Sequence, residues 1–176
     1  NCDDLVSVNL FDTSAATTAQ GMFSGCASLT TVPQFDLSHS ADVQNMFRNC
    51  TQLTSVPLLD TSSATRFDYM FYNCSALTAI PLIDTSNAVN MKYMCSYCTS
   101  ITEVPLLDTS SVNNVAGMFE NCVNVETGAL DLYNQLSSQS VPPQYHSNCF
   151  KDCGSNTTSG AAELSQIPSS WGGTGV

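Results

Sequence analysis

The sequence predicts an α/β solenoid of about seven 24-residue coils, with a parallel β ladder on one face and short helices on the other. The first observation is a cysteine at every twenty-fourth residue: Cys2, Cys26, Cys50, Cys74, Cys98 and Cys122. The second is a pattern that recurs with the cysteines, Leu-Thr-x-Val-Pro-x-Leu-Asp-Thr-Ser followed by Met-Phe-x-x-Cys. Fixed repetition of this kind is typical of chains whose units are stabilised by stacking on their neighbours.

Each unit divides into a strand half and a helix half. The strand half, such as residues 53–59, is rich in leucine and β-branched residues and ends at Asp-Thr-Ser, which favours a turn. Ser62, Ser86 and Ser110 then stand at expected N-cap positions, before apolar residues spaced three apart. We expect a helix of about ten residues there, too short to be stable without its neighbours. The expected core includes Leu53, Val56, Leu77, Ile80, Ile101 and Val104.

The repeats divide one domain into a regular part, residues 1–126, and an irregular last repeat with a C-terminal cap, residues 127–176. Cys149 and Cys153 restore the cysteine pattern late, and Leu164-Ser-Gln-Ile-Pro168 resembles one more strand, closed by Trp171. Atypical terminal units are the usual caps of a solenoid. The chain begins inside a repeat, so we expect an upstream domain or an adjoining subunit to cover the N-terminal end.

The unit resembles a leucine-rich repeat, and its phrase Leu-Asp-Thr-Ser…Met-Phe-x-x-Cys resembles the BspA-like (DUF285) family. The resemblance covers nearly the whole chain and implies a solenoid, an extracellular binding role and no catalytic residue. The C-terminal tail, from Gly128 to Gly173, is similar to the ending of leucine-rich-repeat proteins of gut-bacterial phages. Together these likenesses imply a virion or bacterial cell surface as the location.

Composition argues against several classes of function. Fifteen acidic residues against four basic ones give a net charge of −11, which does not favour nucleic acid as a partner. No apolar run approaches the roughly 20 residues of a membrane helix, so we expect no direct membrane insertion. His39 and His146 are isolated, and no serine or cysteine has a recognisable nucleophile motif. We therefore expect neither an enzyme nor a cofactor.

The nine cysteines allow three interpretations. Equivalent residues of adjacent coils lie about 4.8 Å apart with parallel side chains, whereas a disulfide needs Cβ atoms about 3.8 Å apart that approach each other. A buried row of free thiols is therefore favoured over disulfides. Cys95 and Cys149 replace Met or Phe and are the first candidates for reaction or pairing. Zinc bound by Cys95, Cys98, Cys149 and Cys153 is a weaker third option, because the two pairs lie about two coils apart.

A second row consists of the aspartates Asp12, Asp36, Asp60, Asp84 and Asp108. Stacked carboxylates repel one another unless each is hydrogen-bonded or a cation lies between them. Hydrogen bonds that shape the Asp-Thr-Ser turn are the favoured interpretation. Calcium is the alternative, although the dense Gly/Asp alternation of calcium-binding solenoids is missing.

The candidate ligand-binding residues are those that vary between units on the helix side: Arg48, Arg66, Tyr69, Tyr72, Lys92, Tyr93 and Tyr97. Tyr and Arg are enriched at interface hot spots. Ordinary solvated residues are the alternative interpretation, and the strand side offers a rival surface through Ser55, Ala79, Glu103 and the prolines. We expect an extracellular recognition or adhesion module that binds a cell-surface protein or glycan, in a phage tail or fibre or a bacterial adhesin. A structural protein that assembles into a filament or virion component is the alternative.

Overall fold

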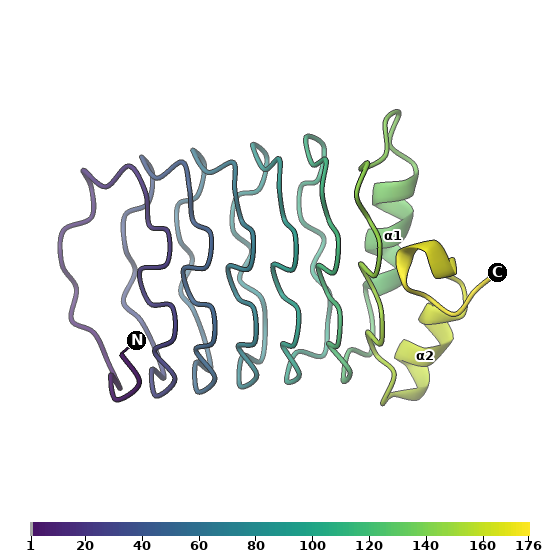
Figure 1. Cartoon of the computed structure of the whole chain (residues 1–176), viewed down its shortest axis with the longest axis horizontal. Helices are drawn as coiled ribbons and strands as arrows, with labels where there is room; N and C mark the ends of the chain where they lie inside the picture. Colours follow the sequence, from purple (N-terminus) through teal and green to yellow (C-terminus); the bar gives the residue numbers. More distant parts are fainter. Residues whose placement is uncertain (1) are drawn as a thin grey trace.

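The computed structural model describes residues 2–176 as a row of stacked coils (Figure 1). Successive coils lie side by side in sequence order, and the C-terminal segment closes the far end. Each coil has two runs on opposite sides of the stack. One is a zigzag run, here called the ladder wall, formed by residues 18–25, 42–49, 66–73, 90–97 and 114–121. The other, here called the proline wall, is formed by residues 29–36, 53–60, 77–84 and 101–108. The expected solenoid is therefore present.

The prediction of a helix in each repeat is wrong. Helices occur only near the C-terminus: α1 (Ala129–Ser137), α2 (Thr158–Leu164) and the short 3₁₀ helix η1 (Ser169–Trp171), and residues 2–128 contain none. Ser62 and Ser86 do not cap helices. Their backbone N–H groups donate instead to Oδ1 of Asp60 and Asp84, at 3.1 and 2.9 Å, and close a turn. The N–H of Ser110 donates to Asp108 in the same way, at 2.9 Å.

The main hydrogen-bond ladder lies on the wall that was expected to be helical. The backbone N–H groups of Val43, Asn45 and Phe47 donate to the carbonyls of Arg66, Asp68 and Met70 in the next coil, at 2.9–3.1 Å. Single parallel bridges join Asp42 to Arg66, Arg66 to Asn90, and Asn90 to Asn114. The proline wall has sparser bonds, such as Thr54 N–H to the Thr30 carbonyl at 3.1 Å. The expected β ladder was thus assigned to the wrong half of the unit.

The zigzag of the ladder wall comes from left-handed residues, which occur twice in each coil. Asn45 and Asn49 have φ of 55° and 62°, and Tyr93 and Tyr97 have φ of 51° and 62°. Between them the chain makes tight turns, such as Met46 N–H to the Val43 carbonyl at 3.3 Å. Alternation of right- and left-handed residues cannot continue as an α-helix, because a helix needs the same sign of φ throughout.

The core between the walls is built from equivalent side chains of successive coils. The rings of Phe23, Phe47 and Phe71 stack with centroids 5.7 Å apart at each step. Leu53, Leu77 and Ile101 are fully buried beside them. Of the expected core residues, Val56 is only partly buried.

The cysteines form a row of buried free thiols, as expected. All nine are unpaired, and all except Cys2 are buried. The thiol of Cys50 donates to the Phe23 carbonyl at 3.1 Å, and Cys98 donates to the Phe71 carbonyl at the same distance. Burial raises the pKa of both thiols to about 12. Cys95 and Cys149 are also buried, and burial raises the pKa of each thiol well above its ordinary value. The expectation that they react first is therefore wrong.

The C-terminal segment covers the end of the stack. Leu132 and Leu136 of α1 are buried against the last coil, and Gly128 turns the chain into the helix with φ of 94°. A side chain at Gly128 would collide with the Val104 carbonyl, so this turn requires glycine. Trp171 is 7% exposed, and its ring stacks on His146 at 4.1 Å. Ile167-Pro168 forms only one bridge, between Pro168 and Gly175, rather than a further strand.

Candidate binding surface

Four tyrosines from neighbouring coils meet on the ladder wall around a hollow of about 370 Å³. We call this surface the tyrosine patch and define it by its lining residues, Arg48, Tyr69, Tyr72, Tyr93, Tyr97 and Glu120. These residues occupy only three positions of the 24-residue unit, so stacking of the coils brings them together. The patch therefore arises from repetition of the unit combined with variation at fixed positions.

Aromatic contacts hold the patch together. The rings of Tyr69 and Tyr93 stack at 5.2 Å, and Tyr72 packs edge-on against Tyr69 and Tyr97, each at 5.6 Å. The Arg48 guanidinium lies over the rings of Tyr69 and Tyr72, at 5.3 and 5.4 Å from their centroids. Aromatic pairs and cation–π contacts each contribute about 0.5–1.5 kcal/mol beyond simple burial. These contacts set the positions of the four rings relative to one another.

The phenol oxygens remain available for a ligand. Within residues 2–176, none of the four patch hydroxyls hydrogen-bonds to a protein group. Burial, followed by the neighbouring Tyr97, raises the pKa of Tyr72. Glu120 adds a carboxylate at the rim, paired with Lys151 at 3.4 Å. The patch therefore offers aromatic faces, hydroxyl donors and one charge of each sign.

The backbone beneath the patch is strained. Tyr69, Tyr93 and Tyr97 have φ of 56°, 51° and 62°, a region that large side chains rarely adopt. The coils on either side place Asn45 and Gly117 at the position of Tyr69 and Tyr93. A Cβ at Gly117 would collide with the Tyr93 ring, so the missing side chain makes room for the patch. Bulky residues in such a conformation cost stability and are typical of functional sites.

The structure places most, but not all, of the predicted site residues together. Arg48 and the four tyrosines line the patch, and Lys92 lies beside it with Nζ 5.4 Å from the Tyr93 centroid. Arg66 lies apart from the lining and contacts Asp42 at 3.8 Å and Asp68 at 3.6 Å. Burial raises the pKa of Asp68, and Arg66 partly opposes that rise. Arg66 also donates to Oε1 of Gln44 at 2.7 Å, so its guanidinium is engaged by neighbours outside the patch lining.

Glu120 was missed by the sequence analysis, although a signal for it exists. It stands 72 residues after Arg48 and 48 after Tyr72, which is the same position of the unit. Aligning all coils at that position would have included it.

The other candidate chemistry has local explanations. Oδ1 of Asp36 accepts from the Ser38 N–H and hydroxyl, at 3.0 and 2.7 Å, and these bonds lower the pKa of Asp36. The aspartate row thus shapes the turns. No group of three or more His, Cys, Asp or Glu residues able to hold a metal ion occurs in the part of the chain that the structure describes. None of the helices in that part is long and apolar enough to span a bilayer.

Comparison with solved structures identifies the same architecture. A leucine rich cell surface protein from Faecalibacterium prausnitzii A2-165 aligns with 22% identity and a TM-score of 0.52, over 79% of this chain and 41% of that protein. A leucine-rich repeat protein from T. pallidum aligns with 19% identity and a TM-score of 0.44, over 92% of this chain and 76% of that one. At these identities the likeness concerns the fold alone. This chain spans less than half of the F. prausnitzii protein.

No curated protein matches the chain. The family of BspA type leucine rich repeat regions matches in 6 copies, over residues 1–126 and 43–157. These matches contain the cysteine row, the ladder wall and the whole tyrosine patch. The chain therefore belongs to the BspA type leucine rich repeat family.

Proposed function

We propose that the chain is an extracellular recognition module that binds a cell-surface protein or glycan through the tyrosine patch. The observation that carries the proposal is the strain at Tyr69, Tyr93 and Tyr97. Large side chains stand there in a left-handed conformation that other coils assign to Asn or Gly. A purely structural role would favour the smaller residues, because they fit this backbone at lower cost.

The chemistry of the patch fits recognition. Tyr and Arg dominate the hot spots of protein interfaces, because they combine a large apolar face with a polar edge. The same combination suits a sugar, whose C–H faces pack on aromatic rings and whose hydroxyls pair with phenols and carboxylates. Tyr97, at 41% exposed, is the most open of the four tyrosines and would meet a ligand first.

A bacterial surface adhesin is the carrier that we favour over a phage tail or fibre. The F. prausnitzii relative is described as a cell surface protein, and the C-terminal similarity to phage proteins is the only support for a virion. The recognition role is the same on either carrier.

Binding of fluorescently labelled protein to bacterial cells, host cells and glycan arrays tests the proposal. Tyr69→Asn and Tyr93→Gly are the sharpest variants, because Asn45 and Gly117 occupy the same position in other coils and fit the same backbone. Each should fold normally and weaken binding by about tenfold or more. Tyr145→Asn is the matched control, since Tyr145 is exposed but lies outside the patch. Normal binding by both patch variants would contradict the proposal.

Assembly into a filament is the second candidate, favoured by the first coil. The carbonyls of Thr18, Gln20, Met22 and Ser24 accept no hydrogen bond from residues 2–176, whereas their equivalents in the next coil all do. We propose that a further coil, from an upstream domain or an adjoining subunit, donates to this edge. The C-terminal cap disfavours simple head-to-tail stacking, because α1, α2 and η1 cover the other end. Growth of the solution mass with concentration, seen by light scattering, would favour the filament.

A further inference from the structure

A row of exposed leucines crosses the proline wall, on the side of the stack opposite the tyrosine patch. Leu58, Leu82 and Leu106 are 60%, 69% and 60% exposed, and they stand one repeat apart. We call these three residues the leucine ridge. Leu10 continues the row with 67% exposure, and Gln34 interrupts it. Single exposed leucines are ordinary, but a repeated row of them forms a continuous apolar surface.

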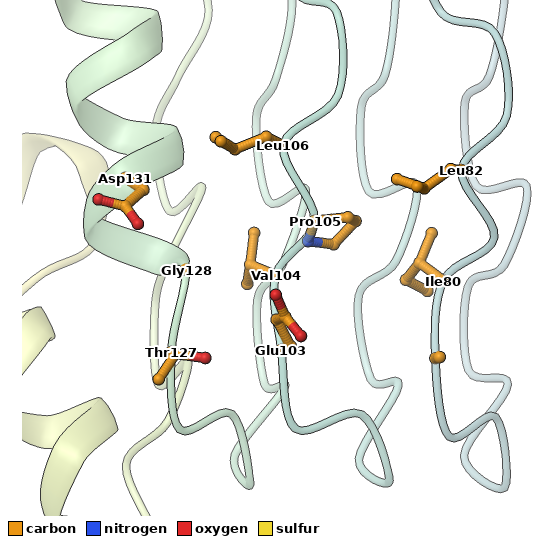
Figure 2. Close-up of a pocket in the computed structure, with 10 residues that line it drawn as sticks. Ile80, Leu82, Glu103, Val104, Pro105, Leu106, Thr127, Gly128 and Asp131 are labelled. Carbon is orange, nitrogen blue, oxygen red and sulfur yellow. The ribbon is translucent and has the colours of Figure 1, made fainter.

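The ridge encloses two hollows. Leu82 and Leu106 flank the first, of about 480 Å³, with Ile80 and Val104 beneath and Asp131 of α1 at its far side (Figure 2). The second, of about 430 Å³, lies between Leu58 and Leu82. The hollows follow one another along the solenoid axis. Each is large enough to receive a leucine-sized side chain of a partner.

The borders of the ridge are acidic. Asp60, Asp84 and Asp108 follow the ridge leucines by two residues and are exposed. In each case Oδ1 accepts a hydrogen bond from the N–H of the serine two residues later, and Oδ2 has no partner among residues 2–176. Glu103 and Asp131 add carboxylates beside the first hollow. The basic residues Arg48, Arg66 and Lys92 lie on the ladder wall, and Lys151 lies in the last coil, so the borders have no internal counter-charge.

We propose that the leucine ridge binds a basic, amphipathic α-helix of another protein, which lies along the solenoid axis. The ridge leucines recur once in each coil, and equivalent residues of stacked coils are about 4.8 Å apart. Side chains at i and i+4 on a helix are about 5–6 Å apart, whereas alternate residues of a strand are about 6.6 Å apart. A helix therefore matches the spacing of the ridge leucines better, and flanking Lys or Arg would pair with the aspartates.

Other occupants fit the ridge less well. Two copies joined ridge to ridge would bring their aspartate rows together, at a cost in repulsion. An anionic membrane would be repelled by the net charge of −11. The ridge is also independent of the tyrosine patch, because the two surfaces share no residue.

A synthetic helix tests the proposal. The probe is a labelled 16-residue peptide that has a leucine at every fourth residue on one helical face and lysines on both sides of that face. Its binding is followed by fluorescence anisotropy. Leu82→Ser combined with Leu106→Ser should weaken binding at least tenfold, and Asp84→Asn combined with Asp108→Asn should weaken it and reduce its salt dependence. Val89→Ser is the matched control, since Val89 is 47% exposed outside the ridge.

Two further peptides separate specific from general attraction. A version with glutamate in place of lysine should not bind, and a scrambled version with the same composition should bind at least tenfold more weakly. Equal binding of the scrambled peptide, or full binding by the double serine variant, would overturn the proposal. Dimerisation of the chain alone that the serine substitutions abolish would show instead that the ridge joins two copies. Tyr93→Gly should leave peptide binding unchanged, which keeps this test separate from that of the tyrosine patch.

Discussion

Two leucines of one coil allow the stacking model to be tested within a single repeat. Leu77 is 0% exposed in the core, and Leu82, five residues later, is 69% exposed on the proline wall. Leu77→Ala removes three buried carbon groups at about 0.8 kcal/mol each and leaves a cavity, so we expect a loss of about 3 kcal/mol of unfolding free energy. Because Leu82 is 69% exposed, Leu82→Ala loses only about a third of the free energy of burying those carbon groups, roughly 0.7 kcal/mol, and it leaves no cavity.

Urea unfolding measures both losses. Circular dichroism follows the whole chain, and the fluorescence of Trp171, the single tryptophan, follows the C-terminal cap. Coincident transitions would justify a two-state analysis, with the free energy extrapolated linearly to water. Each coil contacts only its neighbours, so cooperativity of the stack depends on the contacts between adjacent coils. If the stack unfolds as one unit, a cavity at Leu77 should lower the urea midpoint equally in both signals.

The result that would refute this reasoning is a similar loss for both variants. It would mean that Leu77 is not packed between neighbouring coils as described, or that the denatured chain is already compact there. A loss below about 1 kcal/mol for Leu77→Ala would have the same meaning, since a fully buried leucine rarely contributes so little.

Three further outcomes follow from the backbone, the thiols and the turns. Asn121, with φ of 61°, should tolerate Gly without loss of stability, whereas Val should cost about 1–2 kcal/mol, as measured by urea unfolding; equal stability of the two variants would contradict the left-handed assignment. A thiol reagent at pH 8 should modify only the exposed Cys2 in the folded protein, and modification of Cys98 before unfolding would be inconsistent with its burial and raised pKa of about 12. Hydrogen bonds lower the pKa of Asp36 and Asp84 in the folded state from 3.8. The stability that they contribute is therefore present above pH 3.8 and is lost as the pH falls through the folded pKa values. Asp84→Asn should make the loss of unfolding free energy in acid shallower, and an unchanged loss would argue against this origin.

The period of the sequence was sufficient to predict the solenoid, because a 24-residue repeat brings equivalent residues into register whatever the conformation within each coil. It was insufficient to predict that conformation. Phe47, Cys50 and Leu53 are spaced like the buried face of a helix, and repeated turns with i to i−3 hydrogen bonds produce the same spacing. The signal for the left-handed backbone is the recurrence of Asn and Gly at two positions of the unit, such as Asn45 and Asn49.

The candidate site shows the same division. Tyr69 and Tyr93 stand one repeat apart, so their stacking follows from the period. The position of Arg66 outside the patch does not follow from the period. Its partners Asp42 and Asp68 lie on the same wall as the tyrosines, and the sequence does not indicate which of these neighbours Arg66 contacts. Contact preferences of this kind depend on side-chain directions, which the period does not determine.

The zigzag backbone also gives the molecule an electrical polarity. In an ordinary parallel sheet successive peptide groups point in opposite directions and their dipoles largely cancel. On the ladder wall, the N–H groups of residues 43, 45, 47 and 49 all point toward the following coil, and the carbonyls of residues 42, 44, 46 and 48 all accept from the preceding one. Each ladder peptide group therefore adds a dipole of about 3.5 D in the same sense along the stack. The carbonyl side of this array is its negative pole, and the N–H side, which faces the C-terminal cap, is its positive pole, so the cap covers the side of the stack that would attract anions.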